Sequence, residues 1–263
     1  MIYDKFVEYF KDYKDCFCII GGNAATILLN EDLYQGTSYN FRTTQDYDVV
    51  IIAEMKNQGF SQHFLHFIED NGYITTTSGT NENAHANYYR FETDHTDVPA
   101  MIETFSHPEL KFPLKVANHK TPVPEGEDPS LSAILLNKDY YTVLKEGIVI
   151  RDDLPILDVP YLIYFKARAH LDITKRLAAG ESIGNRANKN KHLNDVCQLS
   201  LLLTPESINK VQKQSIPSNV KDDLEEFIDV IASTSDFKRR FRTIPFELRP
   251  DIKTVISQLR LLL

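Results

Sequence analysis

The pattern of apolar and polar positions changes near residue 155 of this chain. Before that point, short apolar runs alternate with polar turns, which is typical of strands mixed with helices. After it, apolar residues recur at helical spacing over long segments. We therefore expect an α+β fold in two domains, with a mixed sheet and flanking helices in residues 1–155 and a helical domain in residues 156–263.

The same pattern predicts the individual elements. Strands are expected at 16–20, 45–52, 73–77, 88–92, 98–105, 130–136 and 141–149. Helices are expected at 1–14, 23–29, 62–71, 161–179, 191–203, 205–214, 220–233 and 252–262. Polar stretches at 30–41, 78–87 and 117–129 are expected to be loops.

The strand at 45–52 carries the strongest chemical signal. Side chains alternate along a strand, so Asp46 and Asp48 share one face and Tyr47 takes the other. The apolar run that follows predicts a strand buried on both faces. Two neighbouring carboxylates repel each other unless a cation lies between them, and Mg²⁺ binds such oxygens. The alternative is a pair of solvated acids at the end of a strand.

Two further features accompany this strand. Gly21 and Gly22 separate a strand from a helix, where glycine permits positive φ and the helix N-terminus attracts phosphate. In the strand at 98–105, Glu103 shares a face with the apolar Met101 and Phe105. Burying a lone carboxylate is costly, so Glu103 either reaches solvent or faces the same metal as Asp46 and Asp48.

Composition narrows the function classes. The 263-residue chain has a formal net charge of -8, which argues against indiscriminate nucleic-acid binding but permits a local basic groove. Its three cysteines are too few for a disulfide framework. No apolar run approaches the roughly 20 residues that span a bilayer, and the start lacks the layout of a signal peptide. We therefore expect a cytoplasmic protein with no membrane partner.

Basic residues gather in three places in the second half. Lys166 lies on the apolar stripe of its helix, where it either extends to solvent or neutralises the charge of a triphosphate. A second cluster spans 186–195 and reads either as a charged loop or as a ligand contact. In 237–242, Phe237 and Phe241 alternate with cations, as in single-strand RNA binding. The alternative for this segment is an amphipathic helix with a basic outer face.

The order strand, Gly-Gly, helix, Asp-x-Asp strand, later acidic strand resembles the DNA polymerase β-like nucleotidyltransferase superfamily. More narrowly, the sequences at 20–25 and 42–49 resemble its AbiEii/AbiGii-type toxin branch. The resemblance implies a nucleoside triphosphate as substrate and two Mg²⁺ ions, or Mn²⁺ in their place. It assigns the metal to three acids, of which Glu103 also takes the proton of the attacking hydroxyl: Asp46, Asp48 and Glu103. Rivals for the third acid are Glu92 and Asp97.

The resemblance also implies nucleotide contacts outside the acids. Gly21, Gly22 and Asn23 would cradle the β- and γ-phosphates. Thr43 and Thr44 either add hydroxyl donors at the rim of the site or have a structural role at the entrance of the strand. Further contacts to nucleotide or acceptor are carried over onto the helical half: Lys166, Lys189, Lys191 and Asp195. The chain departs from the family pattern in its long gap between Gly22 and Asp46, in Asn23 where Ser or Thr is common, and in a Glu where the third acid is usually Asp.

The function that the resemblance implies is the transfer of a nucleoside monophosphate to a hydroxyl group of an RNA, such as a tRNA 3′ end, or of a protein. Members of that branch act as toxins of toxin-antitoxin or phage-defence systems, so a cognate antitoxin would be a further partner. Two alternatives stay open: a degenerate module that binds a nucleotide or a partner without turnover, and an enzyme that nucleotidylates a small molecule such as an antibiotic.

Overall fold

The computed structural model of this chain describes residues 3–42, 44–52, 58–78, 85–106, 137–180 and 190–263. The described residues divide into two compact units. The first is drawn from Met1–Ala24, Thr43–Glu127 and Ile148–Leu157, and the second from Ala25–Arg42, Asp128–Gly147 and Asp158–Leu263. Each unit therefore contains residues from both sides of position 155, whereas each expected domain was one continuous segment, with the boundary at residue 155.

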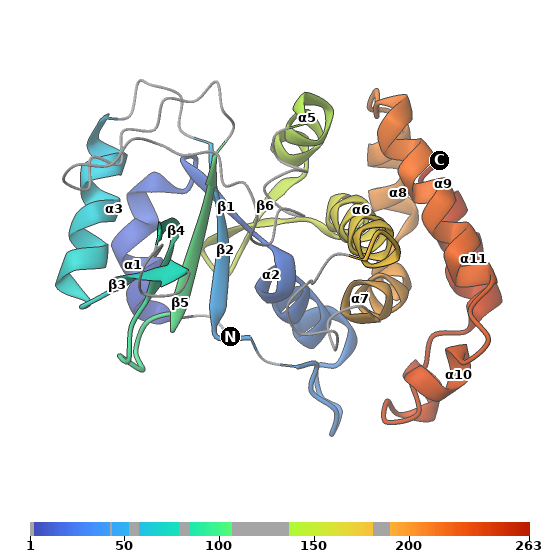
Figure 1. Ribbon diagram of the computed structural model, residues 1–263. Helices are drawn as coiled ribbons and strands as arrows, with labels where there is room; N and C mark the ends of the chain where they lie inside the picture. The colour runs from blue at the N-terminus through green and yellow to red at the C-terminus, as the bar shows by residue number, and fades with distance from the viewer. Residues whose placement is uncertain (1–2, 43, 53–57, 79–84, 107–136, 181–189) are drawn as a thin grey trace. The chain divides into compact units, whose positions relative to one another are not determined.

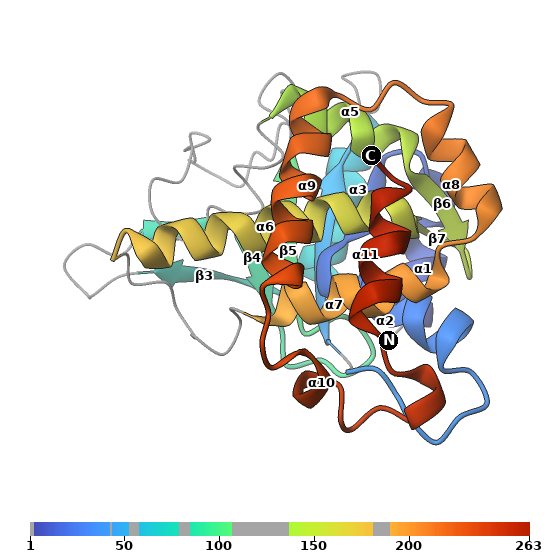
Figure 2. The ribbon, with the colours of Figure 1, turned by 90° about the vertical axis from the view of Figure 1, so that its right-hand side faces the viewer.

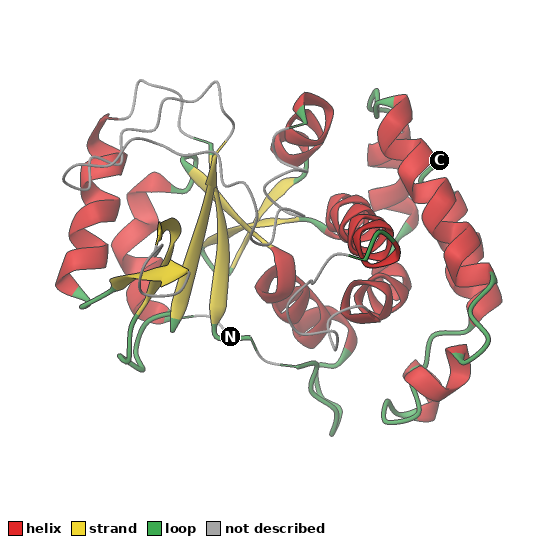
Figure 3. Ribbon diagram, viewed as in Figure 1, coloured by secondary structure: helices red, strands yellow, loops and turns green. Residues whose placement is uncertain are grey.

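The first unit is built on a mixed sheet. In the described residues, seven strands follow the order β3-β4-β5-β2-β1-β7-β6 (Figure 3). Their bounds are β1 Phe17–Ile20, β2 Asp46–Ile51, β3 Ile74–Ser78, β4 His85–Glu92, β5 Met101–Ser106, β6 Ile148–Arg151 and β7 Leu154–Leu157. The central strand β2 pairs antiparallel with β1 and parallel with β5. The expected α+β class with a mixed sheet is confirmed.

Two helices, α1 (Asp4–Phe10) and α3 (Gln58–Asp70), pack side by side on one face of the sheet (Figure 1). A 3₁₀ turn, η1 (Lys11–Tyr13), continues α1. Phe6 of α1 lies 5.0 Å from the Tyr47 ring of β2 and 5.4 Å from Phe67 of α3, centroid to centroid. Such ring contacts fill this face, and truncation of a buried Phe costs roughly 3–5 kcal/mol. The other face of β2 carries Asp46 and Asp48.

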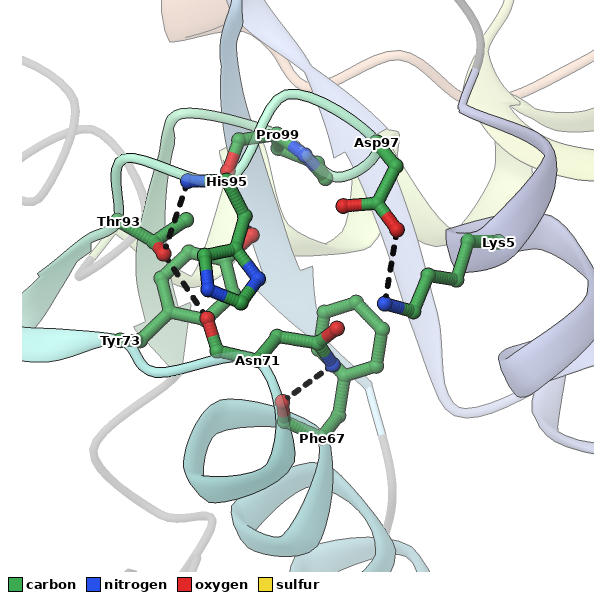
Figure 4. A network of polar contacts seen from close by, with 8 residues as sticks. All are labelled: Lys5, Phe67, Asn71, Tyr73, Thr93, His95, Asp97 and Pro99. Atoms are coloured by element: carbon green, nitrogen blue, oxygen red, sulfur yellow. Dashed lines mark hydrogen bonds and ion pairs between the residues drawn. The ribbon is translucent and has the colours of Figure 1, made fainter.

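Hydrogen bonds fix the turn that leads into β5 (Figure 4). The Tyr73 hydroxyl donates to the Pro99 carbonyl at 2.5 Å, and the Thr93 hydroxyl donates to the Asn71 carbonyl at 2.9 Å. The Asn71 amide itself donates to the Phe67 carbonyl in the last turn of α3, at 2.8 Å. Because these bonds tie the turn between β4 and β5 to the end of α3, they hold β5 in register beside β2.

The second unit is helical, apart from its connecting segments. Its helices are α5 (Lys138–Glu146), α6 (Val159–Ala178), α7 (Lys191–Leu199), α8 (Pro205–Gln212), α9 (Ser218–Ala232), α10 (Phe237–Arg240) and α11 (Ile252–Arg260). Shorter turns are the π-helical η2 (Leu29–Leu33), which follows α2 (Gly21–Leu28), and the 3₁₀ turns η4 (Ser200–Leu202) and η5 (Phe246–Leu248). The long helix α6 packs against α7 and α9, and α11 packs against α9 (Figure 2).

Helix α6 begins with a cap and is buried along most of its length. The Asp158 carboxylate accepts a hydrogen bond from the Val159 amide at 2.8 Å, and Pro160 stands in the first turn. Every residue from Val159 to Ala167 is buried. A helix buried on all sides must be covered by other elements, and α6 is therefore the centre of this unit.

Three expectations about the elements need correction. The strand predicted at 141–149 is mostly helix α5, because Asn137 caps it and the buried Tyr140, Val143 and Leu144 recur at helical spacing. The loop predicted at 30–41 begins with η2. Strand β7 was not expected, since Pro155 obscured the short apolar run. The strand predicted at 130–136 lies outside the described residues, as do the loop at 117–129 and part of the loop at 78–87.

In the part of the chain that the structure describes, no helix combines the length and apolar character needed to cross a membrane.

Candidate functional site

The two acids of β2 stand opposite the aromatic core of the first unit. Tyr47 is fully buried under the rings of α1 and α3, and Asp46 and Asp48 alternate with it onto the other face, where both are partly exposed. Val49, Val50 and Ile51 continue the strand as buried residues. The alternation expected from the sequence is therefore present, and both carboxylates project from a strand that the core holds firmly.

Gly21 packs directly against one of these acids. It follows β1, in which Ile20 pairs with Asp48, and it adopts a φ of +67°. A Cβ atom built on Gly21 would lie 1.8 Å from Asp48 Oδ2, so only glycine fits both the conformation and the space. Helix α2 begins at this residue. A carboxylate at a helix N-terminus is favoured by the helix dipole, so Asp48 and the start of α2 stabilise each other.

Asn23 holds the chain that enters β2. Its side chain is fully buried, and Nδ2 donates to the Thr44 carbonyl at 3.1 Å. Asn23 Oδ1 and Thr44 Oγ1 are buried, and neither has a hydrogen-bond partner within the described ranges. An unpaired buried polar atom costs roughly 1–3 kcal/mol. Asn23 thus has a structural role, and the two unpaired oxygens are groups that a polar ligand can satisfy. Thr43 lies outside the described residues.

The sheet register brings the third acid next to the first two. Strands β2 and β5 run parallel with Asp48 opposite Glu103 and Asp46 opposite Met101, so the three acids share one face of two neighbouring strands. Glu103 does not stand alone on this face. Arg90 of β4 pairs with it, with Nε donating to Oε1 at 2.6 Å and Nη2 at 2.5 Å. This cation explains how a carboxylate is tolerated between Met101 and Phe105.

The two rival acids lie elsewhere. Glu92 is opposite Met101 on β4, one strand further from β2 than Glu103. Asp97 is exposed in the turn before β5, and it accepts a hydrogen bond from Lys5 Nζ at 2.9 Å, on the side of α1 (Figure 4). Of the three candidates, Glu103 is therefore the neighbour of Asp48.

The donor atoms on this face suit a hard divalent cation, with a restriction. Mg²⁺ is often held by one or two carboxylates, with water and phosphate oxygens completing its shell. Asp46 and Asp48 supply such a pair. Across the described residues, however, no three Asp, Glu, His or Cys side chains are gathered as a metal-binding group. Arg90 holds Oε1 of Glu103, so Glu103 can join the aspartates through Oε2, or through Oε1 by leaving Arg90.

In the second unit, three charged side chains form a cluster: the buried Lys166 and Asp195, which the sequence had singled out, and the partly exposed Arg42. Asp195 of α7 is fully buried, and its Oδ2 accepts from Lys166 Nζ at 2.6 Å and from Arg42 Nη2 at 2.5 Å. Lys166 is 2% exposed, so its ammonium neither extends to solvent nor is free to meet a triphosphate while this pair is closed. Removing one member of a buried ion pair costs about 3–5 kcal/mol.

The charges of this cluster are mutually dependent. Burial alone would raise the pKa of the Asp195 carboxyl, but the adjacent Lys166 and Arg42 outweigh it and hold this pKa below its usual value. Burial lowers the pKa of Lys166, and Asp195 opposes that shift. Burial and the Lys166 charge also lower the pKa of His192 to about 3. Asp195 is therefore ionised and His192 neutral at physiological pH.

Some atoms of the cluster remain unpaired. Asp195 Oδ1 and Arg42 Nε are buried and have no hydrogen-bond partner among the residues that the structure describes. Lys191, at the start of α7, is partly exposed, whereas Lys189 lies outside the described residues. The cluster thus contains two of the predicted contacts, Lys166 and Asp195, and leaves polar atoms that a ligand can engage.

Sequence reasoning did not predict the ion pairs that two of the predicted acids form with arginines: Glu103 with Arg90, and Asp195 with Arg42. Arg90 stands in a strand where alternation places it on the face of Glu92, so the face it occupies was predictable once the hairpin was assigned. Its pairing with Glu103 depends on the register of β4 against β5, which no local pattern specifies. Arg42 precedes β2 in the chain, and nothing in the sequence connects it with Asp195.

Comparison of the chain with models of protein families, with curated proteins and with solved structures found no match.

Proposed function

We propose that this chain is a metal-dependent nucleotidyltransferase, which moves a nucleoside monophosphate from a nucleoside triphosphate to a hydroxyl group of an RNA, such as a tRNA, or of a protein. The observation that supports the proposal best is the register of β2 and β5, which places Asp46, Asp48 and Glu103 on one face of adjacent strands. Acids so placed can supply the negative charge that holds the divalent cations of this reaction.

The reaction breaks a phosphoanhydride bond of the triphosphate and forms a phosphoester bond to the acceptor. The acceptor hydroxyl oxygen bonds to the α-phosphorus, the bond between the α-phosphorus and the oxygen leading to the β-phosphate breaks, and pyrophosphate leaves with the electron pair. Glu103 accepts the hydroxyl proton. Arg90 holds Oε1 of this carboxylate at 2.5 Å, and Oε2 is the second oxygen that can take the proton.

The remaining residues bind and orient the substrate. Asp46 and Asp48 would hold Mg²⁺ or Mn²⁺, which supplies positive charge to the triphosphate and to the oxygens that react. The backbone amides of Gly22 and Asn23, in the first turn of α2, would donate to the β- and γ-phosphates. Because Gly21 lies against Asp48, these amides and the metal-binding carboxylate are adjacent.

A second candidate function is a module that binds a nucleotide or a partner without turnover. The closed ion pairs favour it: Glu103 is held by Arg90 and Lys166 by Asp195. In this case the chain binds triphosphate and Mg²⁺ but releases no pyrophosphate. A toxin role with a cognate antitoxin stays a prediction, tested by whether expression arrests growth in the wild type and not in Asp48→Asn.

The deciding experiment supplies the protein with each nucleoside triphosphate labelled at the α-phosphate, Mg²⁺, and either total RNA or total protein, and measures transferred label and released pyrophosphate. We expect transfer that falls at least about 100-fold in Asp46→Asn and in Asp48→Asn, since each removes a metal ligand. The matched control is Asp97→Asn, which removes an exposed carboxylate of the same unit and should leave transfer unchanged.

Label transfer that persists undiminished in Asp46→Asn and Asp48→Asn contradicts the proposal. Metal-dependent nucleotide binding without any transfer favours the binding module instead. Thermal unfolding of each variant establishes that a loss of activity is not a loss of fold.

A further inference from the structure

A short segment of the second unit has a net positive charge, although the chain as a whole is negative. Residues 237–249, here called the basic loop, contain five cations and one acid, for a net charge of five minus one, or +4, in a chain of net charge -8. The cations are Lys238, Arg239, Arg240, Arg242 and Arg249, and the acid is Glu247. The basic loop comprises α10, the turn that follows it and η5 (Figure 2).

One aromatic ring of this loop is exposed to solvent. Phe246 is 82% exposed, the most exposed large apolar side chain in the described part of the protein. Phe237 and Phe241, the rings that the sequence suggested for stacking on RNA, are instead buried and pack on each other at 5.1 Å. They anchor α10, so the face available for stacking belongs to Phe246.

The loop is held in shape before any ligand arrives. Arg249 donates from Nε to the Ile244 carbonyl at 2.7 Å and from Nη2 to the Arg242 carbonyl at 2.8 Å. Its guanidinium carbon also lies 5.7 Å from the Phe246 ring centroid. Ile244 is buried and fixes the middle of the turn. Because the loop is already ordered, a ligand that binds there incurs little of the usual entropy cost.

The two acids that flank the loop are engaged within the protein, whereas Glu247, inside the loop, is exposed. Asp236 accepts from Arg240 Nε at 2.8 Å, and Asp251 caps α11 by accepting from the Lys253 amide at 3.1 Å. Considering the described residues only, neither Lys238 nor Arg242 has a carboxylate within ion-pair distance, and both side chains are exposed. These two cations are therefore available to an anion from outside.

We propose that the basic loop binds single-stranded RNA, with a base stacked on Phe246 and backbone phosphates at Lys238 and Arg242. An aromatic ring beside unpaired cations on a rigid support is the combination that single-strand binding uses. A protein partner would need a larger apolar area around the ring than the surrounding charged side chains provide. The inference rests on the proposed function only in naming RNA as the acceptor; binding itself requires neither Asp46 nor Asp48.

The test measures fluorescence anisotropy of a labelled 12-nucleotide single-stranded RNA and of the same RNA in a duplex, against the full chain at 50 mM salt and at rising salt. We expect the single strand to bind more tightly. Phe246→Ala should weaken that binding at least about 5-fold, whereas Phe246→Tyr keeps a stacking face and stays near wild type. The double variant Lys238→Ala with Arg242→Ala should reduce the slope of log affinity against log salt by about 1.4.

The matched control is Lys213→Ala with Arg260→Ala, which removes two exposed cations of the same unit outside the loop. It should leave the affinity within about twofold of wild type, and thermal unfolding should show every variant folded. Any one of three results overturns the proposal: no binding of the single strand, an affinity of Phe246→Ala equal to that of the wild type, or a control variant that loses as much affinity as the loop variant. Asp48→Asn should bind RNA normally, so failure of nucleotidyl transfer and failure of RNA binding are distinguishable.

Discussion

Replacement of Gly21 by alanine perturbs the contact that joins α2 to the acidic face. The new Cβ would lie 1.8 Å from Asp48 Oδ2 and 2.7 Å from its Cγ, so the carboxylate must move. The backbone adds a second penalty, because Gly21 has a φ of +67°, a conformation that costs an L residue about 1–2 kcal/mol. Turning Asp48 away from its preferred rotamer costs roughly 0.5–1.5 kcal/mol more.

We therefore expect Gly21→Ala to lower the free energy of unfolding by roughly 2–3 kcal/mol, measured by urea denaturation. Gly36→Ala is the matched control, since Gly36 has a φ of +77° and no atom within 4 Å of its Cβ position. It should lose only the backbone part, about 1–2 kcal/mol. For a chain of this size the difference between the variants corresponds to roughly 2–4 °C in melting temperature per kcal/mol.

A double-mutant cycle isolates the clash. Asp48→Ala removes the carboxyl atoms nearest to the new methyl group, so Gly21→Ala should cost less in that background than in the wild type, by roughly 1 kcal/mol. The reasoning is refuted if Gly21→Ala is no less stable than Gly36→Ala, or if the two substitutions are simply additive.

Three further outcomes follow from the ion pairs. Asp195→Ala should lower the free energy of unfolding by about 3–5 kcal/mol, because it leaves the buried Lys166 ammonium without its carboxylate. Glu226→Ala, at an exposed pair, should cost less than about 1 kcal/mol in the same urea assay. The pKa of His192 falls from 6.5 to about 3 on folding, so the unfolded chain binds the extra proton and stability declines as pH falls through that range. Because a single proton is involved, the slope should not exceed about 1.4 kcal/mol per pH unit, and His192→Gln should flatten it in a pH series of unfolding curves. Arg90→Gln should lower the Mg²⁺ concentration for half-maximal label transfer, because Glu103 then has no competing cation; an unchanged Mg²⁺ titration contradicts this.

Local patterns were enough to predict the acidic strand. The alternation of Asp46, Tyr47 and Asp48 follows from backbone geometry alone, and the structure confirms both the strand and its two faces. The position of Glu103 beside Asp48 depends on strand register across 55 positions of the chain, 103 minus 48. That register is set by long-range packing and by the turn that Tyr73 and Pro99 hold. The residue pattern alone therefore left open whether Glu103 reaches solvent or faces the aspartates.

Local patterns misled where strand-forming residues stand in a helix. Tyr140, Tyr141 and Val143 favour strands by propensity, but the Asn137 side chain accepts hydrogen bonds from two amides and starts α5. Tertiary burial of the apolar side then outweighs propensity. The ion pair of Lys166 could not be predicted for another reason. Its partner, Asp195, lies on a different helix, and only the packing of α6 on α7 brings the two together.

The central claim is that the face shared by β2 and β5 binds a divalent cation through Asp46 and Asp48. Its most direct test is Mn²⁺ binding followed by electron paramagnetic resonance, in wild type, Asp46→Asn, Asp48→Asn and the control Asp97→Asn. The account predicts saturable binding in the wild type and the control, strengthened by nucleoside triphosphate, and its loss in the two β2 variants. Wild-type protein that binds no Mn²⁺ with triphosphate present, or β2 variants that bind it unchanged, would contradict the account.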